Sequence, residues 1–419
     1  MTHLVEGAEV WLVRHAETAS NLEDRWLGRS ESPLTTAGHS QNAALAARLR
    51  MTRFDHVVSS PLGRARETAA VIGPASVDDD LTEIDLGRWE GLTTQDVHQR
   101  HRTDLARAIA DETAAFGGSG ESRATVAARF DAAFARLAGR MQPGEKALVV
   151  THGGVLDVLT ERTFGRDENG RRIGSFTANT GITRLVQRAG RWRMRSFNDT
   201  GHLGPRPSLA EKARAGGAPV LALVRHGRTR ANAEGIWQGW SDGGLDDLGR
   251  AQATAFMRWY GAPDRLATSR LGRAVETARL LHPEPEVVDG FEELGFGQWE
   301  GLTTAEIQRD WPDLFARIFE LGHDLPRGDT GETFAQLGQR FARALTALKP
   351  GSSSLTMVVT HGAAIRAYLA SLAADGWARA ASFETPANSS VTHVVITDHG
   401  PVVADFSSAV HLESLDEHV

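Results

Sequence analysis

The sequence has no cysteine, no long apolar run and no basic leader, and each absence excludes a class of protein. Without cysteine, disulfides, thiolate nucleophiles and cysteine-based zinc or iron–sulfur sites are excluded. No apolar run approaches the roughly 18 residues of a membrane-spanning helix. Residues 1–10 lack the basic segment and apolar core of a signal peptide. We therefore expect a cytoplasmic protein that does not bind membranes.

A net positive charge is absent too. The formal net charge is −7 at pH 7, which argues against general binding of nucleic acid. Any site for an anion must therefore be a local cluster. Only three of the 46 basic residues are lysine, and arginine is the better bidentate ligand of phosphate. Genomic base composition is the simpler explanation of this arginine bias.

The chain has 419 residues, more than one hydrophobic core usually serves, and it repeats itself. The repeated pairs are 14–15 with 225–226, 59–69 with 268–278, 81–94 with 291–304, and 149–154 with 358–363. Because these offsets stay nearly constant over almost half of the chain, they indicate a tandem duplication of one domain. We predict a first domain over 1–203, a linker over 204–219 and a second domain over 220–419.

Each half alternates short apolar runs with longer amphipathic ones. In the first half we expect strands at 9–14, 55–59, 146–151, 182–187 and 191–197, and helices at 36–50, 62–73, 94–115, 122–140 and 154–164. This alternation predicts an α/β fold, with two tandem three-layer α/β/α domains and a mostly parallel sheet in each. In the linker, Ser208 and Glu211 suggest a capping box for a short helix that Gly216 would end.

Two expected strands end in an arginine followed by a histidine. These pairs are Arg14-His15 after "VWLV" and Arg225-His226 after "LALV", and each is followed at equal spacing by threonine and asparagine, namely Thr18 and Asn21, then Thr229 and Asn232. A strand that has reached the surface would explain one such pair. The recurrence favours a turn whose donors converge on an anion, at the strand end where open α/β sheets place ligands.

Each half carries a second arginine and a second histidine in repeated motifs. Arg64 and Arg273 stand in "LGRA", in an expected first helical turn where free backbone N–H groups also favour an anion. His152 and His361 follow apolar strands and precede a glycine, which permits close approach of a ligand. A solvated arginine and a core histidine are the plain alternatives, and the repetition favours convergence in one cleft.

A glutamate could supply the proton that a departing oxygen needs in phosphoryl transfer. Glu83 and Glu293 lie in segments rich in carboxylates, where a salt bridge is the plain alternative. An apolar neighbour such as Trp89 could raise the pKa of Glu83 and suit it to this role. Glu90 and Glu300 compete for the same role from the sequence alone.

Two histidines and one glutamate could instead hold a metal ion. Two arginines in the same cleft argue against a metal, because each would repel a divalent cation. The same arginines suit a phosphate dianion, which they can bind by charge-assisted bidentate hydrogen bonds. One histidine could then attack phosphorus while the other donates to its oxygens. We expect no metal and no cofactor.

The motifs "LVRHAETASN", "SSPLGRARETA", "LTEIDLGRWEG", "GGSGES" and "VVTHGG" resemble those of the histidine phosphatase superfamily, which includes cofactor-dependent phosphoglycerate mutases. The resemblance covers nearly all of both halves and implies a phosphoglycerate mutase-like fold. It implies that His15 and His226 are the phosphorylated nucleophiles, and that Glu83 and Glu293 are the acid/base residues. It also implies phosphate-binding roles for Arg14, Asn21, Arg64, His152, Arg225, Asn232, Arg273 and His361.

A few positions depart from the family pattern. Ala16 replaces a usual glycine, Arg228 stands where an acidic or amide residue is common, and Ser407-Ser408 correspond to Asn198-Asp199 of the first half. None of these changes removes a chemical group from the implied sites. We therefore predict two competent sites that differ in substrate, with specificity set by the divergent segments 95–120 and 305–330.

The favoured interpretation is a metal-independent phosphatase that hydrolyses small phosphorylated metabolites through a phosphohistidine intermediate. One alternative is a phosphoglycerate mutase, although mutases of this family tend to have longer inserts around the cleft. The other is a phospho-ligand-binding protein with one inactive half. The sequence decides neither the physiological substrate nor whether the chain forms homo-oligomers.

Overall fold

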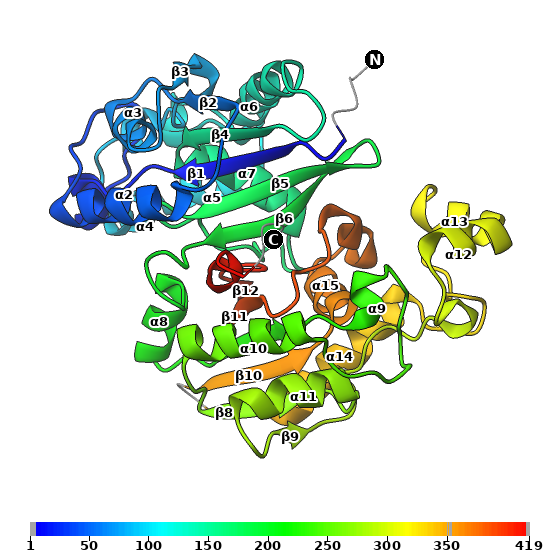
Figure 1. The fold of residues 1–419 in the computed structure, drawn as a ribbon. Helices are drawn as coiled ribbons and strands as arrows, with labels where there is room; N and C mark the ends of the chain where they lie inside the picture. Colours follow the sequence, from blue (N-terminus) through cyan, green and yellow to red (C-terminus); the bar gives the residue numbers. More distant parts are fainter. Residues whose placement is uncertain (1–5, 350, 352–353, 416–419) are drawn as a thin grey trace. The chain divides into compact units, whose positions relative to one another are not determined.

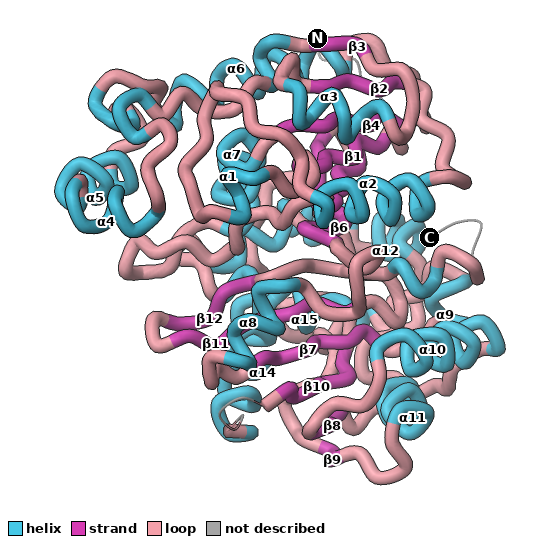
Figure 2. Tube along the Cα trace, turned by 90° about the vertical axis from the view of Figure 1, so that its left-hand side faces the viewer, coloured by secondary structure: helices cyan, strands magenta, loops and turns pink. Residues whose placement is uncertain are grey.

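The computed structural model describes residues 6–349, 351 and 354–415. The chain divides into two compact units, Met1–Thr163 with Phe176–Leu203, and Phe164–Ser175 with Gly204–Val419. Each unit contains a six-stranded sheet with helices packed around it (Figure 1; Figure 2). The predicted fold class of two tandem α/β domains with mostly parallel sheets is confirmed.

In the first unit the strand order is β3-β2-β4-β1-β5-β6. The strands are β1 (Glu9–Arg14), β2 (His56–Ser59), β3 (Ser76–Val77), β4 (Lys146–Thr151), β5 (Ile182–Arg188) and β6 (Arg191–Asp199). The first four strands are mutually parallel, whereas β5 pairs antiparallel with β1 and forms a hairpin with β6. Both central strands, β1 and β4, are almost completely buried, as expected for strands covered on both faces.

The second unit repeats this topology with the order β12-β11-β7-β10-β8-β9. The strands are β7 (Val220–Arg225), β8 (Arg265–Thr268), β9 (Glu286–Val287), β10 (Leu355–Thr360), β11 (Val391–Thr397) and β12 (Gly400–Val403). Here β7 and β10 are the central parallel pair, and β11 is antiparallel to β7. The two units therefore present equivalent strand ends.

The helices of the first repeat follow the predicted amphipathic segments with one difference. They are α1 (Ala19–Leu22), α2 (Thr36–Leu49), α3 (Gly63–Ala70), α4 (Thr94–Arg100), α5 (Arg102–Ala110), α6 (Arg123–Ala138) and α7 (Gly153–Phe164). The predicted single helix over 94–115 is wrong, because His101 leaves helical geometry (φ −126°, ψ 24°) and separates α4 from α5. Leu62 caps α3 in an extended conformation, so Pro61 precedes that helix.

The second unit has eight α-helices among its described residues. They are α8 (Ser208–Ala215), α9 (Arg230–Ala233), α10 (Asp247–Tyr260), α11 (Gly272–Leu281), α12 (Thr304–Asp310), α13 (Pro312–Phe319), α14 (Phe334–Leu348) and α15 (Gly362–Ser371). The predicted linker helix α8 exists and ends at Gly216, but its predicted capping box is wrong. Pro207 is the N-cap residue and supplies no side-chain acceptor, while the Glu211 carboxylate pairs with Arg206.

Residues Phe164–Ser175 belong by their contacts to the second unit, whereas the boundary predicted from the sequence assigns them to the first domain. The N–H of Val403 in β12 donates to the Ile173 carbonyl, and the N–H of Ser175 donates to the Val403 carbonyl, both at 2.8 Å. The ring of Phe164 lies 5.1 Å from that of Phe383. This segment therefore extends the second sheet at β12.

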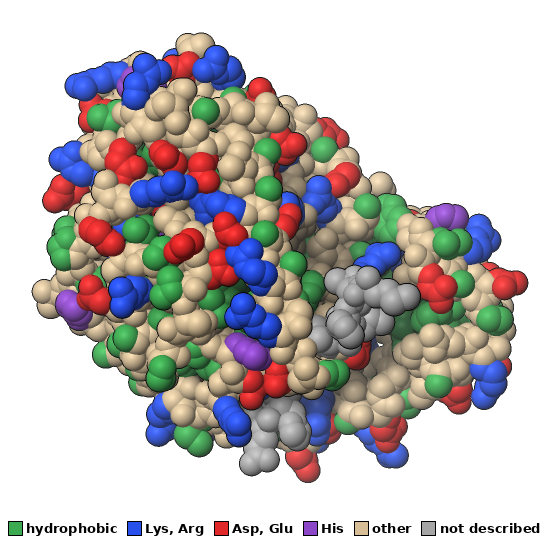
Figure 3. Space-filling model, turned by 90° about the horizontal axis from the view of Figure 1, so that it is seen from above, with side chains coloured by type: hydrophobic (Ala, Val, Ile, Leu, Met, Phe, Trp, Pro, Cys, Tyr) green, Lys and Arg blue, Asp and Glu red, His purple; other side chains and the backbone are tan. Residues whose placement is uncertain are grey.

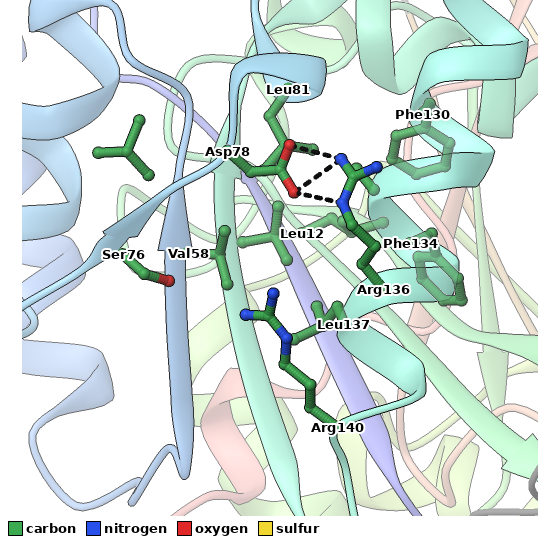
Figure 4. A pocket seen from close by; sticks show the side chains of 13 residues that line it. Leu12, Val58, Ser76, Asp78, Leu81, Phe130, Phe134, Arg136, Leu137 and Arg140 are labelled. Atoms are coloured by element: carbon green, nitrogen blue, oxygen red, sulfur yellow. Dashed lines mark hydrogen bonds and ion pairs between the residues drawn. The ribbon is translucent and has the colours of Figure 1, made fainter.

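A cavity of about 60 Å³ lies between the first sheet and α6 (Figure 4). Leu12 and Val58 line it from the sheet, Phe130 from α6, and Leu81 from the 3-10 helix Asp79–Leu81 that follows β3. Phe291 is the equivalent of Leu81 in the second repeat. The threonine that ends β4 donates to the Leu81 carbonyl, and the threonine that ends β10 donates to the Phe291 carbonyl. A smaller side chain thus leaves space in the first core.

No described helix is both long and apolar enough to cross a membrane. On the face shown in Figure 3, the Lys and Arg side chains are interspersed with Asp and Glu side chains. That face therefore offers no continuous basic surface.

Candidate active site

The residues predicted to form each site come together where the central parallel strands end. Arg14 lies opposite Thr151 in the β1–β4 register, so the next residues along the chain, His15 and His152, are neighbours. Their ring centroids are 5.1 Å apart. In the second unit the rings of His226 and His361 are also 5.1 Å apart. Each pair consists of buried side chains, which brings two imidazoles into one desolvated site.

His15 is held with one ring nitrogen free. Its Nδ1 lies 2.8 Å from the carbonyl oxygen of Ala16, which can only accept, so Nδ1 carries the proton and Nε2 keeps a lone pair. Burial lowers the pKa of His15 well below its usual value, and the charges of Arg14 and Arg64 lower it further. The ring is therefore neutral at physiological pH, which suits a nucleophile.

The second site holds its histidine in the same way. His226 Nδ1 lies 2.7 Å from the carbonyl oxygen of Gly227, and burial together with Arg273 and Arg225 lowers the pKa of His226 well below its usual value. Arg273 Nε donates to His226 Nε2 at 3.3 Å, which requires a lone pair on that nitrogen. In both copies Nδ1 therefore carries the proton and Nε2 keeps a lone pair, and in the second copy that lone pair accepts from arginine.

Backbone carbonyls orient the arginines of the first site. Arg14 donates to the carbonyl of Thr177 at 2.7 Å, and Arg64 donates to the carbonyls of Gly28 and Ser30 at 2.8 Å. The Nε atoms of Arg14 and Arg64 are buried and have no hydrogen-bond partner among the described residues. Such a buried donor is costly unless a ligand accepts from it. These two N–H groups are therefore available to an anion.

The second site repeats this arrangement. Arg225 donates to the Pro386 carbonyl at 2.6 Å, and Arg273 donates to the carbonyls of Gly239 and Ser241 at 2.7 and 3.0 Å. Burial lowers the pKa of Arg225 to about 10, so the guanidinium keeps its charge at neutral pH. Its Nε atom is also buried without a partner among the residues described.

Glu83 is the buried carboxyl of the first site. It accepts hydrogen bonds from the N–H groups of Ile84 and Gly154 at 2.9 and 3.1 Å. Burial raises the pKa of Glu83, although these hydrogen bonds and the charges of Arg64 and Arg14 oppose the rise. A β-carbon at Gly154 would lie 2.6 Å from the Glu83 carboxylate in its present position, so a larger residue here would require the carboxylate to shift. Glu83 is therefore suited to carry a proton to a substrate.

The second site differs at this point. Ala363 replaces Gly154, and its N–H donates to the Glu293 carboxylate at 3.3 Å. The indole Nε1 of Trp240 donates to the Glu293 carbonyl at 2.7 Å, a contact that has no counterpart in the first site because Arg29 stands there. The two acidic groups thus occupy equivalent places with different support.

The competing glutamates have a separate task. Glu90 accepts from the N–H groups of Gly28 and Ser30 at 3.1 and 2.8 Å, and Glu300 accepts from the N–H of Trp240 at 3.0 Å. These carboxylates hold the loop whose carbonyls orient the arginine of each site. They are supports for the pocket, and the geometry favours Glu83 over Glu90 as the group that meets a substrate.

Each asparagine of the predicted sites is oriented by a second asparagine that sequence reasoning missed. Asn21 Oδ1 accepts from the Thr18 N–H at 3.2 Å and from Asn179 Nδ2 at 3.1 Å, which leaves the Asn21 amide nitrogen to donate. Asn388 contacts Asn232 in the same way at 3.1 Å. The repeated pattern Ala-Asn-Thr/Ser, at 178–180 and 387–389, was the available signal.

Two serines were missed as well. The Oγ of Ser60 lies 2.7 Å from His152 Nε2, and the Oγ of Ser269 lies 2.9 Å from His361 Nε2. Each serine stands four residues before the "LGRA" arginine, and both are fully buried. The second histidine of each site is thus contacted on one ring nitrogen by a hydroxyl.

The aromatic residues of the divergent segment 305–330 in the second repeat pack against Trp237 and Trp299, which lie outside it. Trp299 and Ile307 form a buried cluster in which Trp237, Trp311 and Phe315 also pack. These side chains stabilise α12 and α13. Trp240, 42% exposed, is the aromatic residue that contacts the backbone of Glu293. Among the residues described, no group of three or more His, Asp or Glu side chains could hold a metal ion.

Several known proteins are each similar to about half of this chain. The sequence model of the histidine phosphatase superfamily (branch 1) matches residues 10–200 and 221–408. Phosphoglycerate mutase-like protein 4 of Arabidopsis thaliana is 34% identical over 208 residues, 48% of this chain and 88% of that protein. The metal-independent phosphoserine phosphatase of Arabidopsis thaliana is 31% identical over 204 residues, 46% of this chain and 84% of that protein. The solved structure of Bacillus stearothermophilus YhfR is 28% identical, covers 47% of this chain and 99% of its own, and gives a TM-score of 0.43.

Proposed function

Because the chain belongs to the histidine phosphatase superfamily, branch 1, we propose that each of its two repeats hydrolyses small phosphomonoesters through a phosphohistidine intermediate. One observation carries the proposal. In both copies a buried, neutral histidine keeps an Nε2 lone pair beside arginine N–H groups, some of which have no partner among the described residues. A nucleophile beside unpaired cationic donors is what attack on a phosphate ester requires.

The first step is transfer of the phosphoryl group to the histidine. The Nε2 lone pair of His15 attacks phosphorus while Arg14 and Arg64 neutralise the charge on the phosphoryl oxygens. The bond between phosphorus and the ester oxygen breaks, and Glu83 gives its proton to that oxygen. The raised pKa of Glu83 supports this role, because a protonated carboxyl is needed at the start of the step.

The second step releases phosphate and restores the site. Glu83, now a carboxylate, accepts a proton from water as the water oxygen attacks phosphorus. The bond between phosphorus and Nε2 breaks, and inorganic phosphate leaves with the histidine neutral again. Equivalent steps would involve His226, Arg225, Arg273 and Glu293 in the second repeat. Apart from water and the substrate, chain residues supply every group that these steps use, and no step is assigned to a metal.

A phosphoglycerate mutase is the second candidate, and the name of the mutase-like Arabidopsis relative favours it. A mutase must keep water from the phosphohistidine until the product is phosphorylated again. In the first repeat the region between Trp89 and α6 contains two short helices, α4 and α5, and one turn of 3-10 helix at Phe116–Gly118. We favour hydrolysis because such a small cover leaves more access for water than a long insert would.

Hydrolysis of an aryl phosphate by the full chain tests the proposal. We expect activity that a chelator leaves unchanged, a partial loss in His15→Ala and in His226→Ala, and a complete loss in the double variant. Activity in the double variant would refute the phosphohistidine mechanism, and loss with chelator would require a metal. Phosphate exchange between the positions of phosphoglycerate without release would favour the mutase. One inactive single site with retained phosphate affinity would identify a binding-only repeat.

A further inference from the structure

The second histidine of each site, His152 or His361, has one ring nitrogen within hydrogen-bond distance of a serine hydroxyl. Its other ring nitrogen has no hydrogen-bond partner among the described residues. His152 Nε2 lies 2.7 Å from Ser60 Oγ, and the His152 Nδ1 atom is buried with no hydrogen-bond partner among the described residues. His361 and Ser269 repeat this arrangement at 2.9 Å, again with an unpartnered Nδ1. All four residues are fully buried.

Each of these imidazole rings, when neutral, carries a single N–H proton. Burial lowers the pKa of His152 and of His361 well below the usual value, and neighbouring positive charges lower it further. Each ring is therefore neutral and carries its proton on either Nδ1 or Nε2. The two tautomers present opposite chemistry to the site, because one offers an N–H donor from Nδ1 and the other offers a lone pair.

The hydrogen bonds of the serine select between these tautomers. The N–H of Leu62 donates to Ser60 Oγ at 3.3 Å, and the N–H of Leu271 donates to Ser269 Oγ at the same distance. The hydroxyl proton of each serine then needs an acceptor. Within the described part of the chain the histidine Nε2 is the acceptor in reach, so Nε2 must keep its lone pair and Nδ1 must carry the proton.

We propose that Ser60 and Ser269 are positioning residues that hold His152 and His361 in the Nδ1–H tautomer, so that the phosphoryl group meets a donor on each ring. This inference rests on the proposed function for the identity of the anion. The opposite tautomer would aim a lone pair at a negatively charged oxygen and repel it. The serine thereby adds one directed donor to the phosphate site without touching the substrate.

The first site is tested in the full-length chain with His226→Ala as background, so that only one repeat turns over. Ser60→Ala removes the hydroxyl and leaves His152 Nε2 without a donor. We expect kcat/KM for an aryl phosphate to fall about 10- to 100-fold. This loss is at most that of removing one preorganised donor, about 10²- to 10³-fold, because the histidine ring itself remains. The inhibition constant of inorganic phosphate should rise by a similar factor.

Ser59→Ala is the matched control. Ser59 is equally buried and also carries a hydroxyl, but that hydroxyl donates to the Ser60 carbonyl at 2.9 Å and does not contact histidine. We expect Ser59→Ala to keep kcat/KM within about twofold of the background. Ser60→Thr restores a hydroxyl at the same place and should recover most of the activity. If Ser60→Ala does not fold, Ser269→Ala in the His15→Ala background tests the same inference in the second site.

Nitrogen NMR of histidine-labelled protein reads the tautomer directly, with the ring signals assigned by their loss in His152→Asn. We expect Nδ1–H for His152 in the background and in Ser59→Ala, and a mixture or the reverse in Ser60→Ala. An unchanged tautomer in Ser60→Ala would refute the inference, as would a changed tautomer with unchanged kcat/KM. The NMR experiment reports the tautomer without requiring turnover, so its result does not depend on whether the His15→Ala, His226→Ala double variant retains activity. Failure of this inference can therefore be distinguished from failure of the proposed function.

Discussion

Replacing Leu81 with phenylalanine should stabilise the first unit, because the second repeat already carries phenylalanine at this position. Phe291 is fully buried, and its ring lies 5.1 Å from that of Phe341 in α14. In the first repeat Phe130 of α6 corresponds to Phe341, and the smaller Leu81 leaves a cavity of about 60 Å³ beside it (Figure 4). A phenyl ring at 81 can take up part of that space.

The magnitude follows from the cavity volume. Empty core volume costs about 24 cal/mol per Å³, so filling all of it would contribute about 1.4 kcal/mol. The cavity is lined in part by Asp78 and Arg136, which are joined by hydrogen bonds, and the residues around it are not packed to fit a phenyl ring. We therefore expect about half of that value, a gain of roughly 0.5–1 kcal/mol, or about 1–4 °C in Tm for a unit of this size.

Differential scanning calorimetry of the full chain measures this effect, with Phe291→Leu as the reciprocal variant. Phe291→Leu should create a similar cavity in the second unit and lose a ring contact, at a cost of about 1–2 kcal/mol. The two variants should move different transitions in opposite directions. A lower Tm in Leu81→Phe would refute the reasoning, because it would show that the cavity cannot accept a ring. Shifts of one common transition would show that the units unfold together.

Three further predictions concern single side chains. Glu83→Gln should lower kcat/KM of the first site about 10²- to 10⁴-fold. Because burial raises the pKa of folded Glu83, ionisation of this carboxyl destabilises the fold as pH rises. The Tm difference between Glu83→Gln and the parent should therefore grow as pH rises from the usual pKa of glutamate to the raised pKa, and level off above it; a difference that does not change with pH would contradict the assignment. Asn179→Ala should lower first-site kcat/KM about 10-fold or more while Asn388→Ala spares that site, as measured in the His226→Ala background, and equal effects would contradict the separation of the sites. Phe164→Ala should lower the free energy of unfolding of the second unit by about 3–5 kcal/mol, although this residue lies in the first domain predicted from the sequence. Destabilisation of the first unit instead would refute the packing of Phe164 on Phe383.

Much of the fold followed from local patterns. The central strands are short apolar runs that end at a charged or polar residue, and the structure places β1 at Glu9–Arg14 and β4 at Lys146–Thr151, as predicted. Parallel central strands must be apolar along their whole length, so their limits are visible in the sequence. The break at His101 was not, because residues on both sides of it have the polarity of one amphipathic helix.

The candidate site was predictable for a different reason. The arginines and histidines stand in motifs that occur twice, and repetition separates them from the many other arginines of the chain. Ser60 and Asn179 also recur, but serine and asparagine are common in turns and on surfaces. Nothing in their local sequence shows that each one contacts a histidine or an asparagine more than 90 residues away.

The sequence by itself determined the repeated α/β architecture and the set of cations and imidazoles that meet at each strand end, because apolar periodicity and motif spacing are local properties. The residue pattern alone left Glu83 and Glu90 as competitors and the family resemblance named Glu83, but only the tertiary structure supplies the physical reason. Glu83 and Glu90 lie seven residues apart in one carboxylate-rich segment, but the fold buries Glu83 beside Arg14 and Arg64 and engages Glu90 with the backbone of Gly28 and Ser30. Burial and hydrogen-bond partners depend on residues distant in the chain, and these set the pKa values and tautomers on which the chemistry depends.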